Sequence, residues 1–122
     1  MASTAESVGA GGTSENTTMA ALTHVLALFT WLVGPLVIYV VTNDAFVKEN
    51  ARNAVNWQIW FSIYSIVASA FVLMTALVGI GLLIAPVLFL VLGLIDTVLI
   101  VIAAVKASDG EAWHYPLTID LL

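Results

Sequence analysis

The sequence has 122 residues, of which 61% are hydrophobic and only 9% are charged, and its mean hydropathy is +1.08. Soluble domains carry about a quarter charged residues and about half apolar ones, so this composition excludes an ordinary water-soluble globule. Three basic and eight acidic residues give a net charge of −5. This charge argues against nucleic acid as a partner, because binding to phosphates takes clustered basic side chains. The acidic balance would also suit a salt-loving host.

The first 18 residues form a segment of small and polar side chains. They carry too few large apolar groups to offset the entropy lost on folding, so we expect residues 1–18 to be a disordered polar tail. Residues 19–122 then form a single transmembrane helical domain. Because the chain contains no cysteine, disulfides, thiolate nucleophiles and cysteine-based metal sites are excluded.

Long uncharged stretches predict where the chain crosses the lipid bilayer. No residue between Glu15 and Asp44 is charged, and Asp96 is the only charged residue in the stretch 53–105. A helix needs about 20 apolar residues to cross the hydrocarbon layer. Two glycines and a proline within residues 79–86 predict a turn that divides the second stretch. The sequence therefore predicts an all-α integral membrane protein with three transmembrane helices, at about 19–42, 56–78 and 86–106.

The segment between the first two predicted spans has the pattern of an amphipathic helix, at about residues 44–55. Lys48 and Arg52 lie on successive turns of this connector helix, where they could hold a lipid phosphate or an anionic partner segment. The alternative is that they only fix the topology. With three spans, Lys48, Arg52 and Lys106 all fall on one side, which predicts an outside N-terminus and a cytoplasmic C-terminus in the cell membrane.

Aromatic residues border two of the predicted spans. Trp57, Trp60 and Tyr64 begin the second span, and Trp113 and Tyr115 follow the third. Amphipathic rings favour the membrane interface, so an aromatic belt is the simpler interpretation, and stacking or ligand binding is the alternative. The predicted interfacial or anionic contact residues are Lys48, Arg52, Trp57, Trp60, Trp113 and Tyr115.

Small polar residues recur at helical spacing inside the second span, at Gln58, Ser62, Ser65 and Ser69. Such a stripe lets membrane helices approach closely and form hydrogen bonds. The third span offers a matching set in Gly93, Asp96 and Thr97. We therefore expect the two spans to pack with their small faces together.

Asp96 is predicted near the middle of the third span, with no basic residue at its depth. A charged acid there costs about 2.5–3.5 kcal/mol, which the surrounding apolar side chains outweigh. We expect a protonated carboxyl group that donates to Ser69 or Thr30, in a packing or oligomer-bridging role. The alternative is a proton or ion relay. Either role fits a homo-oligomer or a complex with another membrane protein.

Two further features of the sequence concern the first span. Gly34 and Pro35 predict a kink, because proline lacks the amide proton of a helical hydrogen bond. His24 is expected near the outer border and His114 near the inner one, each as an interfacial hydrogen-bonding group. At opposite borders they cannot share a metal ion.

Three runs of sequence carry a family resemblance: residues 19–24, residues 51–59, and residues 106–118 with the Tyr-Pro-Leu-Thr sequence. Together they resemble the Tic-twenty-like family of small membrane proteins, over about residues 19–120. The residues that match its motifs are Arg52, Asn56, Gln58, Tyr115 and Pro116. The resemblance implies a role as a channel scaffold or in protein translocation.

The sequence offers no nucleophile–base pair, carboxylate pair, metal cluster or phosphate-cradling loop. We therefore predict a non-enzymatic scaffold or assembly subunit in the lipid bilayer, with no cofactor and no metal. One alternative is an ion-conducting homo-oligomer built around Asp96, and another is a lipid-surface or partner adaptor that uses the connector helix. Residues 107–122 are expected to form an interfacial C-terminal tail, and its last part, residues 117–122, is expected to lie against the bend at residues 52–58.

Overall fold

The structure is a computed structural model that describes residues 14–122. Within these residues all regular secondary structure is helical, no strand occurs, and residues 109–122 form an irregular segment after the last helix. The helices are α2 (Ser14–Thr30), α3 (Val33–Val41), α4 (Ala45–Ala76) and α5 (Gly81–Ser108). Most of the predicted disordered tail lies outside the described residues, but residues 14–18 belong to the first turns of α2.

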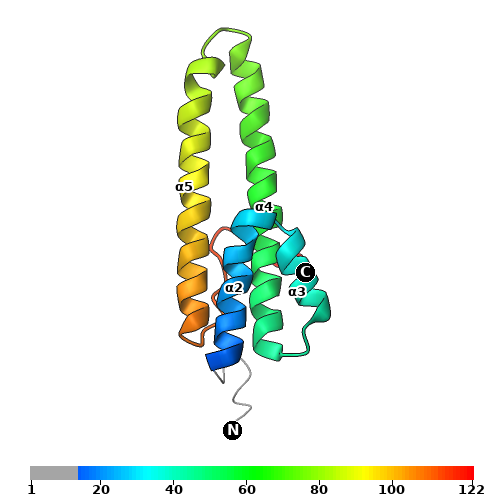
Figure 1. Cartoon of the computed structure of the whole chain (residues 1–122). Coiled ribbons are helices and arrows are strands. Elements are labelled where there is room, and N and C mark those ends of the chain that lie inside the picture. Colours follow the sequence, from blue (N-terminus) through cyan, green and yellow to red (C-terminus); the bar gives the residue numbers. More distant parts are fainter. Residues whose placement is uncertain (1–13) are drawn as a thin grey trace.

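Helices α4 and α5 form a long antiparallel hairpin, and both are long and apolar enough to cross a membrane. Figure 1 shows that α2 and α3 lie beside only the lower part of this hairpin. The upper part presents apolar side chains on its outside, including Ile66, Leu73 and Leu90, each with more than 60% of its surface exposed. In water such a surface would be strongly unfavourable, so the hairpin has the character of a membrane-spanning element.

The prediction of three transmembrane helices is not confirmed, because the segment 19–42 is not one helix. It breaks at Trp31, whose φ is 57°, and α3 then runs back beside α2 (Figure 1). Pro35 explains the position of the break: it has no amide proton for the Trp31 carbonyl, and its ring would clash with that group. The indole Nε1 of Trp31 also donates to Ser62 Oγ on α4 at 2.8 Å. The predicted kink at Gly34–Pro35 is therefore a reversal that begins four residues before Pro35.

This reversal changes the predicted topology as well. The start of α2 lies at the same end of the molecule as the start of α4 and the end of α5 (Figure 1). A hydrogen bond of 3.1 Å from Asn16 Nδ2 to Asp44 Oδ2 fixes the first two of these together. Helices α2 and α3 thus lead away from this end of the molecule and back to it. This arrangement does not support the prediction that the two ends of the chain lie on opposite sides of the membrane.

The predicted connector helix is not a separate element. Residues 45–76 form one continuous helix of 32 residues, with no glycine or proline to interrupt it. The Asp44 carboxylate caps its start by accepting from the Val47 amide at 2.9 Å, as an N-cap aspartate does. The first three turns of α4 are largely buried against the other helices instead of lying on a membrane surface.

The turn between the long helices occupies residues 77–80, earlier than the predicted turn at 79–86. Gly79 adopts a positive φ of 85°, which a residue with a side chain rarely does. Helix α5 then begins at Gly81, five residues before the predicted start, and contains Pro86. At Gly81 the two helices touch, because a Cβ there would clash with the Val72 carbonyl oxygen and the Ala76 amide nitrogen.

Replacing Gly81 with alanine is therefore expected to destabilise the hairpin. The added methyl group meets the backbone of α4, which cannot rotate away, so we expect a net cost of about 1–3 kcal/mol. The matched control is Gly93→Ala on the same helix, where a Cβ would have nothing within 4 Å. That control should be neutral or stabilise by up to about 1 kcal/mol, through the higher helix propensity of alanine. Thermal unfolding in detergent measures both, and equal midpoints for the two variants would contradict the close approach at Gly81.

The buried core lies at the lower end of the molecule, where all four helices and the C-terminal tail meet. The C-terminal tail, called the tail below, consists of residues 109–122, which follow the end of α5. One apolar cluster contains Ala27, Trp57, Ile100, Ala103 and Tyr115. A second lies closer to the start of α4 and contains Ala20, Phe46, Val47 and Ala107. Small residues on α2 and α5 thus allow the helices to close around the large rings of α4 and the tail.

Candidate functional site

A fully buried histidine on α2 is the centre of the most polar part of this core. His24 Nδ1 lies 2.7 Å from the Tyr115 hydroxyl, and its Nε2 lies 2.9 Å from Asn50 Oδ1. The Asn50 amide is oriented by its other bond, in which Nδ2 donates to the Phe46 carbonyl at 2.9 Å. Asn50 Oδ1 is thus the acceptor for the Nε2 proton of His24. A neutral imidazole then leaves Nδ1 free to accept the proton of the Tyr115 hydroxyl.

Burial keeps both members of this pair uncharged. It lowers the pKa of His24 from 6.5 to about 4, although the Asn50 hydrogen bond acts in the opposite direction. Burial also raises the pKa of the Tyr115 phenol well above 10, and the nearby Asp96 carboxylate adds to the effect. A neutral imidazole and a neutral phenol are therefore the forms present near pH 7.

Tyr115 connects this pair to the long helices. Its ring stacks on the Trp57 indole with a centroid distance of 5.4 Å and an interplanar angle of 6°. The indole Nε1 of Trp57 in turn donates to Asp96 Oδ1 on α5 at 2.8 Å. A continuous series of contacts thus runs from α2 through the tail and α4 to α5.

Five rings form a connected series at this site, which we call the aromatic chain: Trp113, Tyr115, Trp57, Tyr64 and Trp60. Successive centroids in that order are 5.3, 5.4, 6.5 and 5.9 Å apart. These rings are five of the seven tryptophan and tyrosine residues of the protein. The two terminal rings of the aromatic chain, Trp113 and Trp60, are only partly buried.

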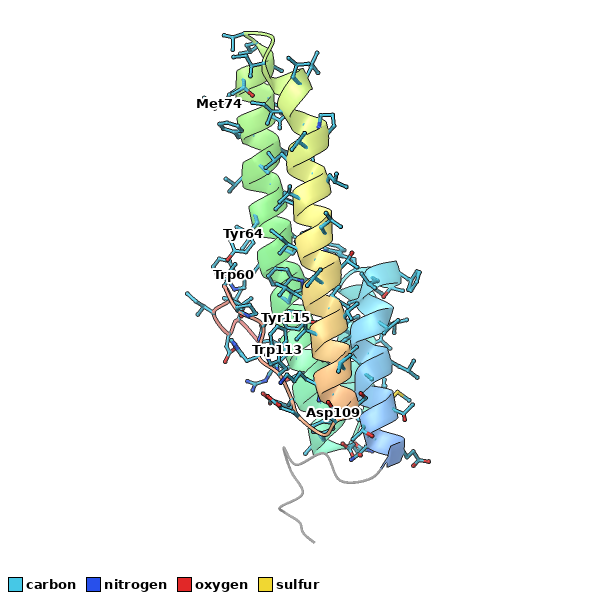
Figure 2. The ribbon with its side chains drawn as sticks, turned by 90° about the vertical axis from the view of Figure 1, so that its left-hand side faces the viewer. Trp60, Tyr64, Met74, Asp109, Trp113 and Tyr115 are labelled. Carbon is cyan, nitrogen blue, oxygen red and sulfur yellow. The ribbon has the colours of Figure 1, made fainter. Side chains whose placement is uncertain are left out.

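The tail is held along α4 mainly through its backbone. Figure 2 shows it running beside the hairpin, with Trp113 and Tyr115 near the lower part of α4 and Trp60 and Tyr64 above them. Side chains of α4 supply most of the hydrogen bonds. Asn53 Nδ2 donates to the Trp113 carbonyl at 3.1 Å, and Trp60 Nε1 donates to the Ile119 carbonyl at 2.8 Å. The Tyr64 hydroxyl donates to the Leu117 carbonyl.

The very end of the tail is held mainly by the amide side chain of Asn56, and Arg52 donates to the Leu122 carbonyl at 3.5 Å. Asn56 Oδ1 accepts from the backbone amides of Leu121 and Leu122, at 3.0 and 2.9 Å. Its Nδ2 donates to Asp120 Oδ1 at 3.4 Å, and the same carboxylate oxygen lies 2.7 Å from His114 Nε2. Asn56 therefore orders the last residues of the chain against α4.

Charged groups surround this site at the lower end of the molecule. Arg52 pairs with Glu49 at 2.6 Å and Lys106 with Glu111 at 3.7 Å, and all four side chains are partly exposed. Lys48 lies over the Tyr39 ring, 4.9 Å from its centroid. Exposed pairs of this kind add little stability. No group of three or more metal-ligating His, Asp or Glu side chains occurs within residues 14–122.

The structure places most of the predicted contact residues in the core and around the tail. Trp57 and Tyr115 are 1% exposed and belong to the core, not to an aromatic belt. Trp60 lies beside the tail, Trp113 belongs to it and accepts a hydrogen bond from Asn53, and Arg52 is paired with Glu49. Of the residues assigned to the family motif, Arg52 and Asn56 form hydrogen bonds to the tail, and Tyr115 and Pro116 lie within it. Gln58 is buried on α4.

The predicted small-residue interface is not formed as expected. Ser69, Gly93 and Thr97 are exposed on the hairpin, and Ser65 and Ser62 are partly buried. The hydroxyls of Ser62 and Ser69 donate to carbonyl groups of their own helix. Asp96 is paired with Trp57 instead of Ser69 or Thr30, because the turn at residues 77–80 shifts the register of the hairpin. That shift places Asp96 nearer the buried core than the middle of the apolar hairpin.

Sequence reasoning missed the role of His24. It was assigned to a membrane border opposite His114, but it is 0% exposed and contacts the tail. A signal was present in the sequence: His24, Asn50, Asn53 and Asn56 are polar residues placed among apolar ones. Buried polar groups need hydrogen-bond partners. His24 bonds to Asn50 and Tyr115, and Asn53 and Asn56 bond to the backbone of the tail.

Comparison with known proteins identifies the family. No curated protein and no solved structure shows significant similarity to the chain. One family profile matches residues 15–122, which is nearly the whole chain. This match overturns the resemblance to the Tic-twenty-like family and removes the basis for a translocation role, and it gives no support to a salt-loving host. The chain belongs to the MamF/MmsF family, the magnetosome magnetite crystal formation protein family.

Proposed function

We propose that this protein is a non-enzymatic, membrane-anchored scaffold that supports magnetite crystal formation at the magnetosome membrane. The observation that carries the proposal is the separation of apolar and charged surfaces along the molecule. Within residues 53–105, Asp96 is the only charged residue, and the upper hairpin exposes apolar side chains. The other charged residues of the described chain fall within 15–52 and 106–120, at the lower end.

The hairpin is suited to anchoring, and the lower end is suited to presentation of a fixed surface. The four helices and the tail meet there in a core held by the Tyr115–Trp57 stack and the His24 hydrogen bonds. A surface built on such a packed core keeps its shape, which favours assembly with partners through specific contacts. A further copy of this chain or another membrane protein is the expected partner.

The anchoring part of the proposal is tested in a magnetite-forming bacterium that lacks the gene. Wild-type protein should restore crystal size and number, as measured by electron microscopy. Ile66→Lys places a charge on the exposed face of the hairpin, near the middle of the apolar part of α4, where insertion of lysine costs about 2.5–3.5 kcal/mol, so we expect less membrane-bound protein and poor restoration. The control Ser108→Lys adds the same charge at the exposed end of α5 and should restore crystals fully. Normal crystals in cells without the gene would contradict the proposal.

Asp96 distinguishes a scaffold from an ion path. Its hydrogen bond to Trp57 supports a packing role, since an asparagine oxygen can accept the same indole proton. We therefore expect Asp96→Asn to restore crystal formation and to leave proton and cation flux unchanged in reconstituted vesicles. Loss of a wild-type flux in this variant would favour conduction instead.

A further inference from the structure

The aromatic chain has features that neither anchoring nor scaffolding uses. Two adjacent rings of this series, Tyr115 and Trp57, are each hydrogen-bonded to a proton acceptor. The Tyr115 hydroxyl donates to His24 Nδ1 at 2.7 Å, and the Trp57 indole donates to Asp96 Oδ1 at 2.8 Å. Tyrosine and tryptophan are the side chains that most readily lose a single electron, and each becomes a strong acid when it does. A ring with a hydrogen-bonded acceptor can therefore lose an electron and a proton together.

Burial limits the chemistry that the His24–Tyr115 pair can perform. Their side chains are 0% and 1% exposed, so no substrate can reach either group for acid–base or nucleophilic catalysis. Electron transfer needs no such access, because it occurs between neighbouring rings. The aromatic chain supplies these neighbours and leads in both directions to partly buried rings, Trp113 and Trp60.

We propose that the aromatic chain is a one-electron redox relay in which Tyr115 is the resting site of the oxidising equivalent, as a neutral tyrosyl radical. The proposal concerns a second activity and does not depend on the scaffold role. Tyr115 is favoured over Trp57 as the resting site because a neutral tyrosyl radical forms at a lower potential than a neutral tryptophanyl radical. The stacked geometry of the two rings, with an interplanar angle of 6°, favours exchange between them.

A one-electron oxidant, of the class formed when ferrous iron reacts with peroxide, takes one electron from Trp60 or Trp113 and is reduced. The electron vacancy passes along the aromatic chain to Tyr115, whose hydroxyl proton moves to His24 Nδ1. The resulting imidazolium keeps its Nε2 proton, which still donates to Asn50. A small-molecule thiolate then gives one electron to Tyr115 and becomes a thiyl radical, and the proton returns from His24 Nδ1 to restore the phenol and the neutral imidazole.

The environment of His24 is compatible with this transfer. Burial lowers its pKa to about 4, so the imidazole is neutral and Nδ1 is available to accept a proton. A tyrosyl radical cation is a far stronger acid than an imidazolium ion of that pKa. The proton transfer is therefore downhill, and the existing hydrogen bond means that no group has to move for it to occur.

The test uses the full chain in lipid nanodiscs, with ruthenium tris-bipyridine as photo-oxidant and persulfate as electron acceptor. Electron paramagnetic resonance and transient absorption detect the radicals that form. We expect a tyrosyl radical in the wild type, its loss in Tyr115→Phe, and no change in Tyr39→Phe. Tyr39 is the matched control, because its ring contacts Lys48 and lies outside the aromatic chain. Tyr115→Phe preserves the ring that stacks on Trp57.

His24→Gln tests the proton acceptor. Glutamine can hydrogen-bond to Tyr115 but is a very weak base, so we expect slower tyrosine oxidation and a changed solvent deuterium isotope effect. A purely structural role for His24 would leave both unchanged in folded protein, which would overturn the proposal. The proposal would also be overturned by an equal tyrosyl signal in Tyr115→Phe, or by the absence of that signal in the wild type. The isotope effect on the wild-type rate gives an answer even where a variant fails to fold, since a value of one would show that no proton moves in the rate-limiting oxidation step and would contradict the joint loss of electron and proton proposed here.

Discussion

Deleting residues 113–122 is expected to lower the free energy of unfolding in detergent by at least about 5 kcal/mol, from the loss of a buried aromatic ring and several buried hydrogen bonds. The deletion removes Tyr115, which fills the core beside Trp57, and leaves His24 Nδ1 without its partner. It also exposes the amide groups of Asn53 and Asn56 that hold the tail. Thermal and denaturant unfolding, followed by circular dichroism, measure the loss.

Two milder variants separate the contributions to this loss. Deleting only residues 121–122 removes two backbone hydrogen bonds to Asn56 but preserves the stack, so we expect a loss of about 1–2 kcal/mol. Tyr115→Phe preserves the ring but leaves His24 Nδ1 without its hydrogen-bond partner, at a cost of about 1–3 kcal/mol. An unchanged midpoint after deletion of residues 113–122 would show that the tail does not dock on α4.

The apolar hairpin could be predicted from the sequence because its cause is local. Charge is nearly absent from residues 53–105, and glycine marks the turn, so composition alone indicates two long apolar helices there. The first segment has a similar composition, yet it reverses at Trp31. Pro35 weakens the helix at that point, but whether the result is a kink or a reversal depends on contacts with α4, such as that from Trp31 to Ser62. Such contacts join residues far apart in sequence.

The candidate site could be predicted less well than the hairpin, for a related reason. Taken one at a time, the aromatic residues near the ends of the predicted spans fit an aromatic belt at the membrane interface as well as they fit a buried core. Their pairing across the core depends on the register of the hairpin, and a turn at 77–80 instead of 79–86 brings Asp96 to Trp57. His24 was separated from Tyr115 in the prediction because a three-span topology places them at opposite borders. The prediction treated residues 19–42 as one straight helix, and the division of this segment into α2 and α3 is what brings the two halves of the site together.

Lowering the pH from 7 to 5 is expected to destabilise the protein by about 2 kcal/mol through His24 alone. The pKa of this group is about 4 in the folded protein and about 6.5 when exposed in the unfolded chain. Between these values the unfolded chain binds a proton that the folded protein does not, so acid favours unfolding. The stabilisation from the neutral imidazole is complete above pH 6.5 and falls progressively as the pH approaches 4. No charged side chain is hydrogen-bonded to His24, whose partners are Asn50 and Tyr115.

Chemical unfolding at a series of pH values, followed by tryptophan fluorescence, measures this slope. His24→Gln should be less stable at pH 7 but should lose the His24 part of the pH dependence, because glutamine does not titrate. His114→Gln is the matched control, since His114 is exposed and bonded to Asp120 outside the core. That variant should preserve the His24 contribution to acid destabilisation. The same slope in His24→Gln as in the wild type would mean that His24 is not buried as a neutral group, and the hydrogen bond to Tyr115 would then need a different donor and acceptor assignment.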